Sequence, residues 1–594
     1  MVTTAVPHHL NGADHGSGLV PTPTEDNLPR RYSDFATLGE ALDYAAQGRR
    51  GLNYHDHRAE LVRVLSFAEL REAAMADAAR LRAAGIQPGD RVALIAETTP
   101  EFHAAFFAGI LAGAWPAPLP LPTSFGGREA FVDQIANQIR SCEPKLVLGP
   151  AELLPHMEEA AARTPGVRAL DWDSFHDLPA APFRPHPTRP DDVAFLQYSS
   201  GSTRFPHGVM ITHANILANN ARQGLDMDPQ DSDRIVSWLP MYHDMGLVGH
   251  FLCSIANQIS TDYISTEDFA RRPLAWLTLI SRNEGTSCAF SPTFGYDICA
   301  RRVGNNAEMA ARFDLSRWRV AGNGADMIRP DVMQAFIDSF APAGFKASAF
   351  LPSYGLAEAT LALSLMPAGQ GIQTDLVDER RLLGEDESLP LGRPPRLRPI
   401  VNCGKPIRFH EIQIRDKEGR ALPEESIGRI FARGPSIMKG YFRDPEATAA
   451  VLSPDGWLDT GDMGYLKQGH LYIVGRAKDM IIINGRNYWP QDIEWAIEQL
   501  PGFKSGDIAA FAITDTGGEE LPAVLVQCRV SDPAERARIR DEIKARVRQI
   551  TGMNCVVELV PPRTLPRTSS GKLSRTKARN LYLSGAIQTF DIAA

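Results

Sequence analysis

A loop rich in hydroxyl groups and glycine follows an apolar, strand-like segment at 193–196. The loop reads Tyr-Ser-Ser-Gly-Ser-Thr-Arg-Phe-Pro-His-Gly-Val over 198–209. Glycine permits close approach of the backbone to a ligand, and successive N–H groups can form a nest for an anion. Hydroxyl groups add further donors, so the composition favours a phosphate-binding loop. The residues that we expect to contact phosphates are Ser199, Ser200, Gly201, Ser202 and Thr203.

The same composition also fits an ordinary Ser/Gly linker, and both interpretations stay open at this point. A Walker A loop is excluded, because the pattern G-x-x-x-x-G-K-[S/T] is absent. A nucleotide phosphate would therefore be held by a loop of another type.

Six further motifs follow the loop along the chain. They read W-L-P-M-Y-H-D-M-G-L over 238–247, A-G-N-G-A-D over 321–326, S-Y-G-L-A-E over 353–358, G-W-L-D-T-G-D over 456–462, G-R-A-K-D over 475–479 and S-S-G-K over 569–572. Each resembles a motif of the adenylate-forming superfamily, which includes acyl-CoA synthetases, firefly luciferase and the adenylation domains of peptide synthetases. Because seven motifs occur in the family's order across about 375 residues, the chain is identified as a member of this superfamily.

Within the superfamily the chain is most similar to the fatty acyl-AMP ligases, which pass acyl groups to acyl carrier proteins or polyketide synthases and use coenzyme A poorly. The resemblance lies in the motif at 238–244, in G-R-N-Y-W-P-Q-D-I-E over 485–494 and in an extra stretch after Glu358. It implies that ATP, with Mg²⁺, and a fatty acid are converted to an acyl-AMP and pyrophosphate. The acyl group would then pass to an acyl carrier protein or a polyketide synthase.

Glu358 matches the magnesium-binding glutamate of the family. A carboxylate is the hard oxygen ligand that suits an ion bridging triphosphate oxygens, and the ion neutralises charge as pyrophosphate leaves. The alternative is a glutamate in the first turn of an apolar helix over 359–365, where the helix dipole would favour a negative charge.

Other matches imply a nucleotide site. Tyr354 is expected to stack on adenine, and Asp462 to accept hydrogen bonds from both ribose hydroxyls, which suits an ionised carboxylate. Arg476 is expected to make a second ribose or phosphate contact. Each also has an ordinary interpretation, namely a core tyrosine, an Asx turn and a surface salt bridge. The residues expected to line the adenine edge are Asn323, Gly324, Ala325 and Asp326.

Three more residues take roles from the resemblance. Lys572, in a small flexible loop, would place an ammonium group between the attacking carboxylate and the α-phosphate, which otherwise repel each other. His243 would gate the acyl pocket, and Lys478 matches the hinge at which the small domain pivots between an adenylating and a transfer pose. The alternatives are a solvated lysine for Lys572 and a packed core histidine for His243.

Two motifs depart from their commonest superfamily versions. Arg204 and His207 stand where a Gly and a Lys usually stand in the phosphate loop. A neutral histidine removes a cation from the phosphates, although Arg204 could supply one, and an arginine at this place is itself similar to the loop of fatty acyl-AMP ligases. The adenine motif ends in Asp326-Met327, where relatives often have Glu-Pro.

Composition limits the class of protein. The chain has 594 residues, more than one hydrophobic core usually organises, so at least two domains are expected. The net charge of -9 gives no general attraction to nucleic acid or to an anionic membrane, and neither is expected as a partner. The seven cysteines include no C-x-x-C pair, which argues against a zinc site or a disulfide framework and favours free thiols in a reducing cytoplasm.

Two segments bear on targeting and membranes. The first thirty residues lack the apolar run of a signal peptide, and we expect them to form a flexible tail. The longest apolar run, Phe102 to Trp115, is about 14 residues, shorter than the ~20 needed to span a bilayer. It predicts a buried helix and no integral membrane association.

The remaining pattern predicts an α/β protein. Helix-like and strand-like segments alternate from 66 to 365, among them a helix over Phe67–Ala84 and a strand over Arg91–Ala96. The large domain is expected to span 31–474 and to combine α/β sub-domains with a β sub-domain, whose strands include Glu411–Arg415 and Gly428–Ala432. Residues 367–400 are rich in proline and predict a long loop or insertion.

A small, mobile α/β domain is expected over 475–594. Its predicted strands are Ile481–Ile483, Ile508–Ile513 and Ala523–Val530. A helix should begin after Asp532, with Pro533 in its first position. Between Glu535 and Arg579 there are twelve Lys/Arg and four Asp/Glu. This excess of positive charge would attract an acidic carrier protein. The alternative is that some of these basic residues bind ATP and the others form a solvated helix face.

Two other functions compete with a fatty acyl-AMP ligase. One is an acyl-CoA synthetase, which would produce acyl-CoA when coenzyme A is supplied. The other is a non-catalytic protein that binds acyl-adenylates, and it is disfavoured because Lys572, Glu358 and Asp462 are all present.

Overall fold

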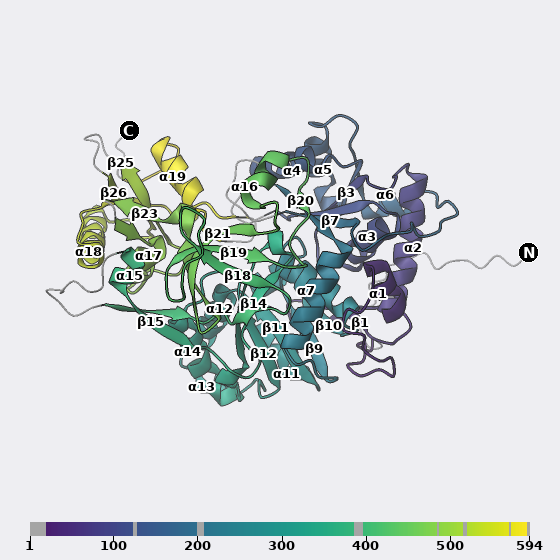
Figure 1. Cartoon of the computed structure of the whole chain (residues 1–594), viewed down its shortest axis with the longest axis horizontal. Helices are drawn as coiled ribbons and strands as arrows, with labels where there is room; N and C mark the ends of the chain where they lie inside the picture. Colours follow the sequence, from purple (N-terminus) through teal and green to yellow (C-terminus); the bar gives the residue numbers. More distant parts are fainter. Residues whose placement is uncertain are drawn as a thin grey trace, which may run out of the picture.

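The computed structural model describes residues 19–122, 127–198, 207–384, 396–483, 486–514, 520–568 and 572–590. The N-terminal part of the chain lies at one end of the molecule and the C-terminal part at the other (Figure 1). No helix within the described ranges is long and apolar enough to cross a membrane. All seven cysteines are free thiols, and all but Cys288 are buried.

A nine-stranded sheet forms the centre of the large domain in the described chain, in the order β17-β14-β13-β12-β11-β9-β10-β1-β2. The strands from β13 to β1 pair in parallel, whereas the pairs at both ends are antiparallel. The strands are β1 (Gly51–His55), β2 (Leu61–Ser66), β9 (Asp233–Ser237), β10 (Thr261–Ile264), β11 (Thr286–Ser291), β12 (Trp318–Asn323), β13 (Phe350–Gly355), β14 (Ala362–Leu365) and β17 (Lys405–Pro406).

The parallel pairing explains why distant motifs meet. Parallel strands place their carboxyl ends at one edge of a sheet, and α/β proteins bind ligands there. Strand β9 ends at Ser237, immediately before the 238–247 motif. Strands β12 and β13 end inside the motifs at 321–326 and 353–358. Three of the seven motifs therefore lie at the same edge of the central sheet.

Two smaller sheets consist mainly of strands from the first half of the chain, with β20 as the exception. One is parallel, in the order β4-β3-β5-β6, and the other is antiparallel, in the order β20-β8-β7. Strands β7 and β8 flank the predicted phosphate loop, of which 199–206 lies outside the described residues. The strands are β3 (Arg91–Ile95), β4 (Trp115–Leu119), β5 (Leu146–Gly149), β6 (Arg168–Asp171), β7 (Val193–Tyr198), β8 (Gly208–Thr212) and β20 (Gly440–Tyr441).

The predicted helices of this region are present. Helix α2 (Phe67–Ala83) begins with a capping box between Ser66 and Glu69. The apolar run predicted as one buried helix divides, because α3 (Pro100–Leu111) ends at Leu111 and Trp115 begins strand β4. Helix α3 is buried almost throughout, as predicted.

The β sub-domain is a four-stranded sheet in the order β18-β19-β21-β22. Strands β18 (Glu411–Arg415) and β19 (Gly428–Arg433) confirm the two predicted strands, and β21 (Leu458–Lys467) and β22 (His470–Arg476) complete the sheet. Gly475 and Arg476 still pair with β21. The predicted boundary at 475 therefore lies inside a strand, and the sub-domain extends to residue 476.

Of the two alternatives predicted for 367–400, the long loop is wrong where the chain forms β15, α15 and β16, and the insertion stays a prediction. Strand β15 (Thr374–Asp378) pairs along its length with β16 (Leu397–Val401), and α15 (Glu379–Leu383) follows β15. Pro399 is tolerated because a two-stranded sheet consists only of edge strands. We call residues 374–401 the insertion hairpin, of which 385–395 lies outside the described residues.

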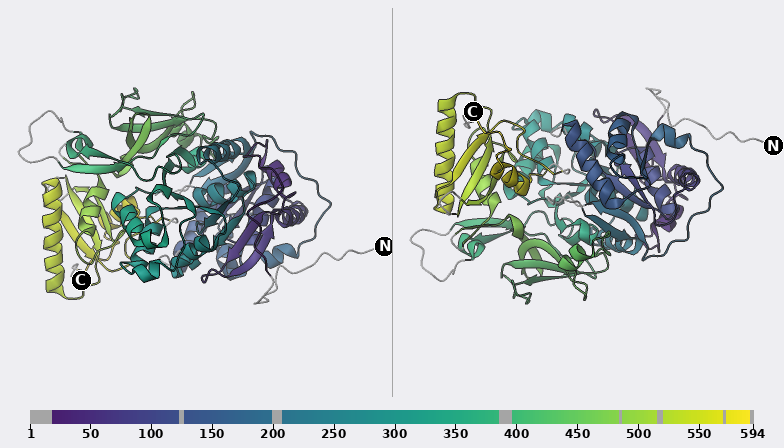
Figure 2. Two further views of the ribbon diagram at one scale, coloured as in Figure 1. Left: turned by 90° about the horizontal axis from the view of Figure 1, so that it is seen from below. Right: turned by 90° about the horizontal axis from the view of Figure 1, so that it is seen from above.

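The small domain is the α/β unit that the sequence predicts. Its three-stranded sheet carries α17 and α18 on one face and α19 on the other, because Ile508 and Ala510 pack with α18, whereas Ala509 and Phe511 pack with Ala578 of α19. Helix α18 lies on the outer side of the molecule (Figure 2) and is capped by Asp532, as predicted. The elements are β23 (Ile481–Ile483), β24 (Arg486–Tyr488), α17 (Pro490–Glu498), β25 (Ile508–Thr514), β26 (Glu520–Gln527), α18 (Pro533–Thr551), β27 (Val556–Val560) and α19 (Arg575–Leu583).

Candidate active site

A cavity of about 2900 Å³ is bounded by the carboxyl ends of the central strands, the β sub-domain and the small domain. We call it the cleft. Residues from all seven motifs line it; the phosphate-loop motif contributes Tyr198 and His207, and its stretch 199–206 lies outside the described residues. The predicted site residues that line the cleft are His243, Ala325, Asp326, Tyr354, Glu358, Asp462, Arg476, Lys478 and Lys572.

Asp462 is held from two sides. The Tyr354 hydroxyl, at the end of β13, donates a hydrogen bond to its Oδ2 at 2.7 Å, and Arg476 Nε donates to its Oδ1 at 3.1 Å. Asp462 and Arg476 are direct partners in the pairing of β21 with β22, so the sheet itself sets their spacing. Burial, followed by the charge of Asp462, raises the pKa of Tyr354 well above its ordinary value, so the tyrosine stays a donor. The three predicted nucleotide contacts therefore form one cluster.

Glu358 lies in a 3₁₀ turn, η5 (Ala357–Ala359), and not in the helix that its alternative interpretation required. The apolar stretch after it forms strand β14, because Thr360 takes a positive φ of 71° that ends the turn. The Tyr441 hydroxyl donates to Glu358 Oε1 at 2.9 Å, and the Glu358 carbonyl accepts from Met438 N at 2.8 Å. Burial raises the pKa of Glu358. A divalent cation beside this carboxyl would favour its ionised form.

His243 and Asp244 form a second pair of neighbouring side chains, in the segment that follows β9. His243 Nδ1 lies 2.7 Å from Asp244 Oδ1, and Met245 N donates to both side chains. Burial would by itself raise the pKa of Asp244, but His243 and then Lys572 outweigh it, so the pKa is lowered. His243 is partly exposed to the cleft, which disfavours the packed core histidine.

Asp326 is oriented by a residue that the sequence did not single out. The backbone N–H of Thr293 donates to Asp326 Oδ1 at 3.0 Å, and the Thr293 hydroxyl donates to the Met327 carbonyl at 3.3 Å. Thr293 directly follows the Ser-Pro that ends β11, so it lies at the same sheet edge as the other motifs. Burial raises the pKa of Asp326.

Two predicted adenine contacts do not line the cleft. Asn323 is fully buried, with its Oδ1 accepting from the Thr293 hydroxyl at 3.4 Å and its Nδ2 near Met333 Sδ. Gly324 packs against Ser353, because a Cβ there would lie 2.6 Å from the Ser353 hydroxyl oxygen. Both residues support the strand end, and their contact with adenine stays a prediction.

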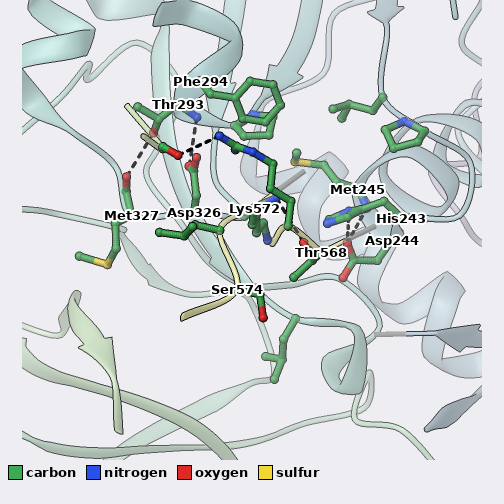
Figure 3. Close-up of a pocket in the computed structure, with 18 of the residues that line it drawn as sticks. His243, Asp244, Met245, Thr293, Phe294, Asp326, Met327, Thr568, Lys572 and Ser574 are labelled. Atoms are coloured by element: carbon green, nitrogen blue, oxygen red, sulfur yellow. Dashed lines mark hydrogen bonds and ion pairs between the residues drawn. The ribbon is translucent and has the colours of Figure 1, made fainter. Parts of the chain in front are cut away.

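Lys572 reaches the cleft from the small domain. In Figure 3 it lies between Asp326 on one side and the His243–Asp244 pair on the other. Burial lowers the pKa of Lys572, while Asp326 and Asp244 oppose that shift. The loop is closed at its base, because Thr568 N donates to the Lys572 carbonyl at 2.8 Å and Lys572 N donates to the Thr568 hydroxyl at 3.2 Å. A lysine that faces two carboxylates in the cleft disfavours the alternative of a freely solvated lysine.

His207 lies beside the magnesium candidate. Its Nδ1 is 3.1 Å from Asp444 Oδ2, and its ring packs 4.8 Å from the ring of Tyr441, the residue that binds Glu358. His207 thus has a carboxylate partner and lines the cleft. The predicted phosphate contacts Ser199, Ser200, Gly201, Ser202 and Thr203, together with Arg204, lie outside the described residues.

Lys478 lies in the 3₁₀ turn η6 (Ala477–Asp479), which joins the last strand of the β sub-domain to the first strand of the small domain. Burial, followed by the charge of Arg476, lowers its pKa. A turn that links two bodies is a suitable place for a pivot, and the hinge role of Lys478 stays a prediction.

A smaller cavity of about 40 Å³ continues from the cleft under the π-helix η2 (Leu247–Leu252). We call it the end pocket. Four residues line both cavities, namely Met227, Gly249, His250 and Phe290. One water needs roughly 10–15 Å³, so the end pocket has room for a few methylene groups. Its walls include Ile235, Cys253, Ile259 and Cys288.

The comparisons with known proteins agree with this geometry. A model of the AMP-binding enzyme family matches residues 49–442. The chain is 47% identical over 579 residues to a putative acyl-CoA synthetase of Caulobacter vibrioides, covering 96% of this chain and 99% of that protein. It is 31% identical over 587 residues to the medium-chain-fatty-acid–[acyl-carrier-protein] ligase JamA of Moorena producens, covering 94% and 97%.

A solved structure from structural and functional studies of fatty acyl-adenylate ligases from E. coli and L. pneumophila superimposes with a TM-score of 0.89. Its sequence identity to this chain is 42%, and the match covers 94% of this chain and 100% of that one. The similarity thus includes the small domain that carries Lys572.

Proposed function

The chain belongs to the AMP-binding enzyme family, and on this basis we propose that it activates a fatty acid with ATP and passes the acyl group to an acyl carrier protein or a polyketide synthase. The enzyme is an adenylate-forming ligase, with fatty acyl-adenylate ligases among its structural relatives. The observation that carries the proposal is that Lys572 of the small domain lines the same cleft as Glu358 and Asp462 of the large domain.

The reaction forms one bond and breaks one. A carboxylate oxygen of the fatty acid attacks the α-phosphorus of ATP, the bond from that phosphorus to the bridging oxygen of the β-phosphate breaks, and pyrophosphate leaves with the electron pair. Both reactants are anions, so a cation between them lowers the barrier. The ammonium of Lys572, which faces Asp326 and Asp244, is suited to that place.

The nucleotide is proposed to bind between Tyr354 and the Asp462–Arg476 pair. The ribose hydroxyls would donate to Asp462, and Arg476 supplies a fixed positive charge beside it. The pKa of Arg476 is raised, because Asp462 outweighs the effect of burial, so this cation persists at every physiological pH.

Glu358 fits a magnesium site in which the nucleotide supplies most ligands. Among the described residues, no group of three or more His, Cys, Asp or Glu side chains is arranged to hold a metal ion. Mg²⁺ often binds through one or two carboxylates together with substrate phosphates, which agrees with a single buried glutamate. When bound there, Mg²⁺ would neutralise charge on the leaving pyrophosphate.

Two observations favour a carrier over coenzyme A as the acceptor. The insertion hairpin ties the small domain to the large one, because Trp489 Nε1 donates to the Leu382 carbonyl at 3.2 Å and Arg398 pairs with Asp492 at 3.0 Å. These contacts limit rotation of the small domain, which is the motion that would expose a new channel for the acceptor. The basic surface of α18 and α19 suits an acidic carrier, and JamA is by its name a carrier-protein ligase.

An acyl-CoA synthetase remains the second candidate, because the Caulobacter vibrioides relative carries that name. Products formed from ATP and fatty acids of graded length, with either coenzyme A or a carrier protein, separate the two. Acylated carrier without acyl-CoA supports the proposal. Acyl-CoA as the main product would replace the proposed function with that of an acyl-CoA synthetase. A KM for the carrier protein that does not rise with salt concentration would contradict electrostatic docking of the carrier.

We propose a cytoplasmic location, because the reaction consumes ATP and the cysteines are free thiols. The hinge proposal has its own test. Lys478→Pro should spare acyl-AMP formation more than acyl transfer, and an equal loss of both would contradict it.

A further inference from the structure

Arg575 joins three parts of the small domain. It is the first residue of α19 and follows Lys572 by three residues. Its Nε and Nη2 donate to the two carboxylate oxygens of Glu494 in α17, both at 2.7 Å, and its Nη1 donates to Asp479 Oδ2 at 3.1 Å. Asp479 ends the turn that contains the hinge candidate Lys478. One guanidinium therefore connects the lysine loop, a core helix and the hinge turn.

The partners of Arg575 are themselves fixed. The Glu494 side chain is only 6% exposed, and its Oε1 also accepts from Ala510 N in strand β25 at 3.0 Å. Two parallel hydrogen bonds from a guanidinium to a carboxylate fix orientation as well as distance. Removal of one partner would leave the other as an uncompensated, largely buried charge. The arrangement is therefore rigid.

The other side of the lysine loop is anchored as well. Arg567 pairs with Leu573 in an isolated β-bridge, and its Nη2 donates to the Gly506 carbonyl at 3.0 Å. Ser574 N donates to the Pro566 carbonyl at 2.9 Å. These contacts hold the base of the loop against the small domain, but none of them reaches the hinge turn. In the part of the chain that the structure describes, Arg575 makes that connection.

Building on the function proposed above, we propose that Arg575 is a positioning residue that fixes Lys572 relative to the hinge turn. Rotation about Lys478 would then carry the Lys572 ammonium into and out of the cleft as one body with Asp479 and α17. Misplacement of a catalytic group by about 1 Å can cost about 100-fold in rate, so a loosened loop should impair adenylation without loss of nucleotide binding.

The test measures pyrophosphate release by the full-length enzyme with ATP and a fatty acid. Arg575→Gln should lower kcat by about 100-fold and change KM for ATP by less than about threefold. Arg575→Lys keeps one charged contact and should recover part of the rate. Arg529→Gln, at an exposed arginine of the small domain that lies outside α18 and α19, is the matched control and should retain the wild-type rate.

A double-mutant cycle separates positioning from general destabilisation. If Arg575 acts through Lys572, Arg575→Gln should have no further effect in a Lys572→Met background, whereas a purely structural role would lower the residual rate again. Should Arg575→Gln fail to fold, Asp479→Asn breaks the link to the hinge turn with a nearly isosteric change and enters the same cycle. Additive losses, or a wild-type kcat in Arg575→Gln, would overturn the proposal. An inactive wild-type enzyme would instead refute the proposed function.

Discussion

The Tyr354 hydroxyl donates a 2.7 Å hydrogen bond to Asp462 and so joins the end of the central sheet to the β sub-domain. The two residues are 108 positions apart in the sequence, yet the bond is buried. It holds the carboxylate beside Arg476 at the place where a nucleotide ribose is proposed to bind. The relationship means that a change at Asp462 affects both the site and the contact between the two units.

Asp462→Asn should weaken ATP binding. The amide removes the negative charge that pairs with Arg476 and is a poorer acceptor for two ribose hydroxyls. We expect KM for ATP to rise by about 10–100-fold, which corresponds to ~1.4–2.7 kcal/mol. The measurement is initial-rate kinetics of pyrophosphate release. Asp416→Asn, in a turn where Asp416 pairs with Arg420, is the control, and an equal effect of both changes would contradict the role of Asp462.

Adenylation should lose activity on the alkaline side at an unusually low pH for a lysine. Burial lowers the pKa of Lys572 below its ordinary value of 10.5, so the ammonium is present below the lowered pKa and is lost as pH rises through it. The dependence of kcat/KM on pH reports the pKa values of the essential groups in the free enzyme. Lys572→Arg should be slower but should lack this alkaline limb, because arginine stays protonated. An unchanged limb in that variant would assign it to another group.

Gly249 should set how far an acyl chain extends. It lies between the cleft and the end pocket, and a Cβ there would meet Leu361 Cδ2 at 2.9 Å. Gly249→Val should therefore shift the preference in kcat/KM toward shorter fatty acids, by about 10-fold or more for chains that need the end pocket. Gly39→Ala in α1 (Leu38–Ala45), where a Cβ meets nothing closer than 3.7 Å, is the control. A preference that does not depend on residue 249 would place the chain elsewhere.

Arg329 and Glu498 should hold the small domain in the observed pose. Arg329 precedes α14 (Pro330–Phe340) in the large domain and forms a largely buried ion pair with Glu498 of α17. Its guanidinium also lies 5.3 Å from the ring of Trp495, and Arg398 approaches the same ring at 5.4 Å. Glu498→Gln should slow adenylation by about 3–10-fold, because it removes the ionic contact between the two domains, while Arg329 keeps Asp331 as its partner.

Because the small domain should be held less firmly in Glu498→Gln, limited proteolysis should cleave this variant near the hinge turn faster than it cleaves the wild type. Glu535→Gln on the exposed face of α18 should change neither the adenylation rate nor the proteolysis. Faster adenylation in Glu498→Gln would show that the pair opposes the active pose.

The motifs of the sequence name residues that the fold brings into one cleft, whereas the segments between the motifs were predicted less well. Periodicity and caps identified elements such as α2 and α18, because their signals lie within a few neighbouring residues. The pairing of β15 with β16 joins Thr374 to Val401 and Asp378 to Leu397 across a proline-rich stretch, and no local pattern reports such a contact. The apolar stretch after Glu358 was mistaken for a helix because four residues do not distinguish the two periodicities.

Within the site, motif matches supplied residues but not their partners. Thr293 lies outside every motif, and its role depends on where β11 ends relative to β12, which only the fold decides. Asn323 lies inside a motif yet is fully buried, because the whole end of β12 is covered by neighbouring residues. Arg575 follows a motif closely, but its partners Glu494 and Asp479 are 81 and 96 positions away.

The central claim is that Lys572 promotes attack of a fatty acid carboxylate on ATP within the cleft. Mass spectrometry of the products, with pyrophosphate measured in parallel, tests it most directly in the wild type and in Lys572→Met. We predict acyl-AMP and equimolar pyrophosphate from the wild type, and a rate lower by about 100–1000-fold in the variant. Acyl-AMP formed at the same rate by both proteins, or no acyl-AMP from the wild type with any fatty acid, would contradict the account.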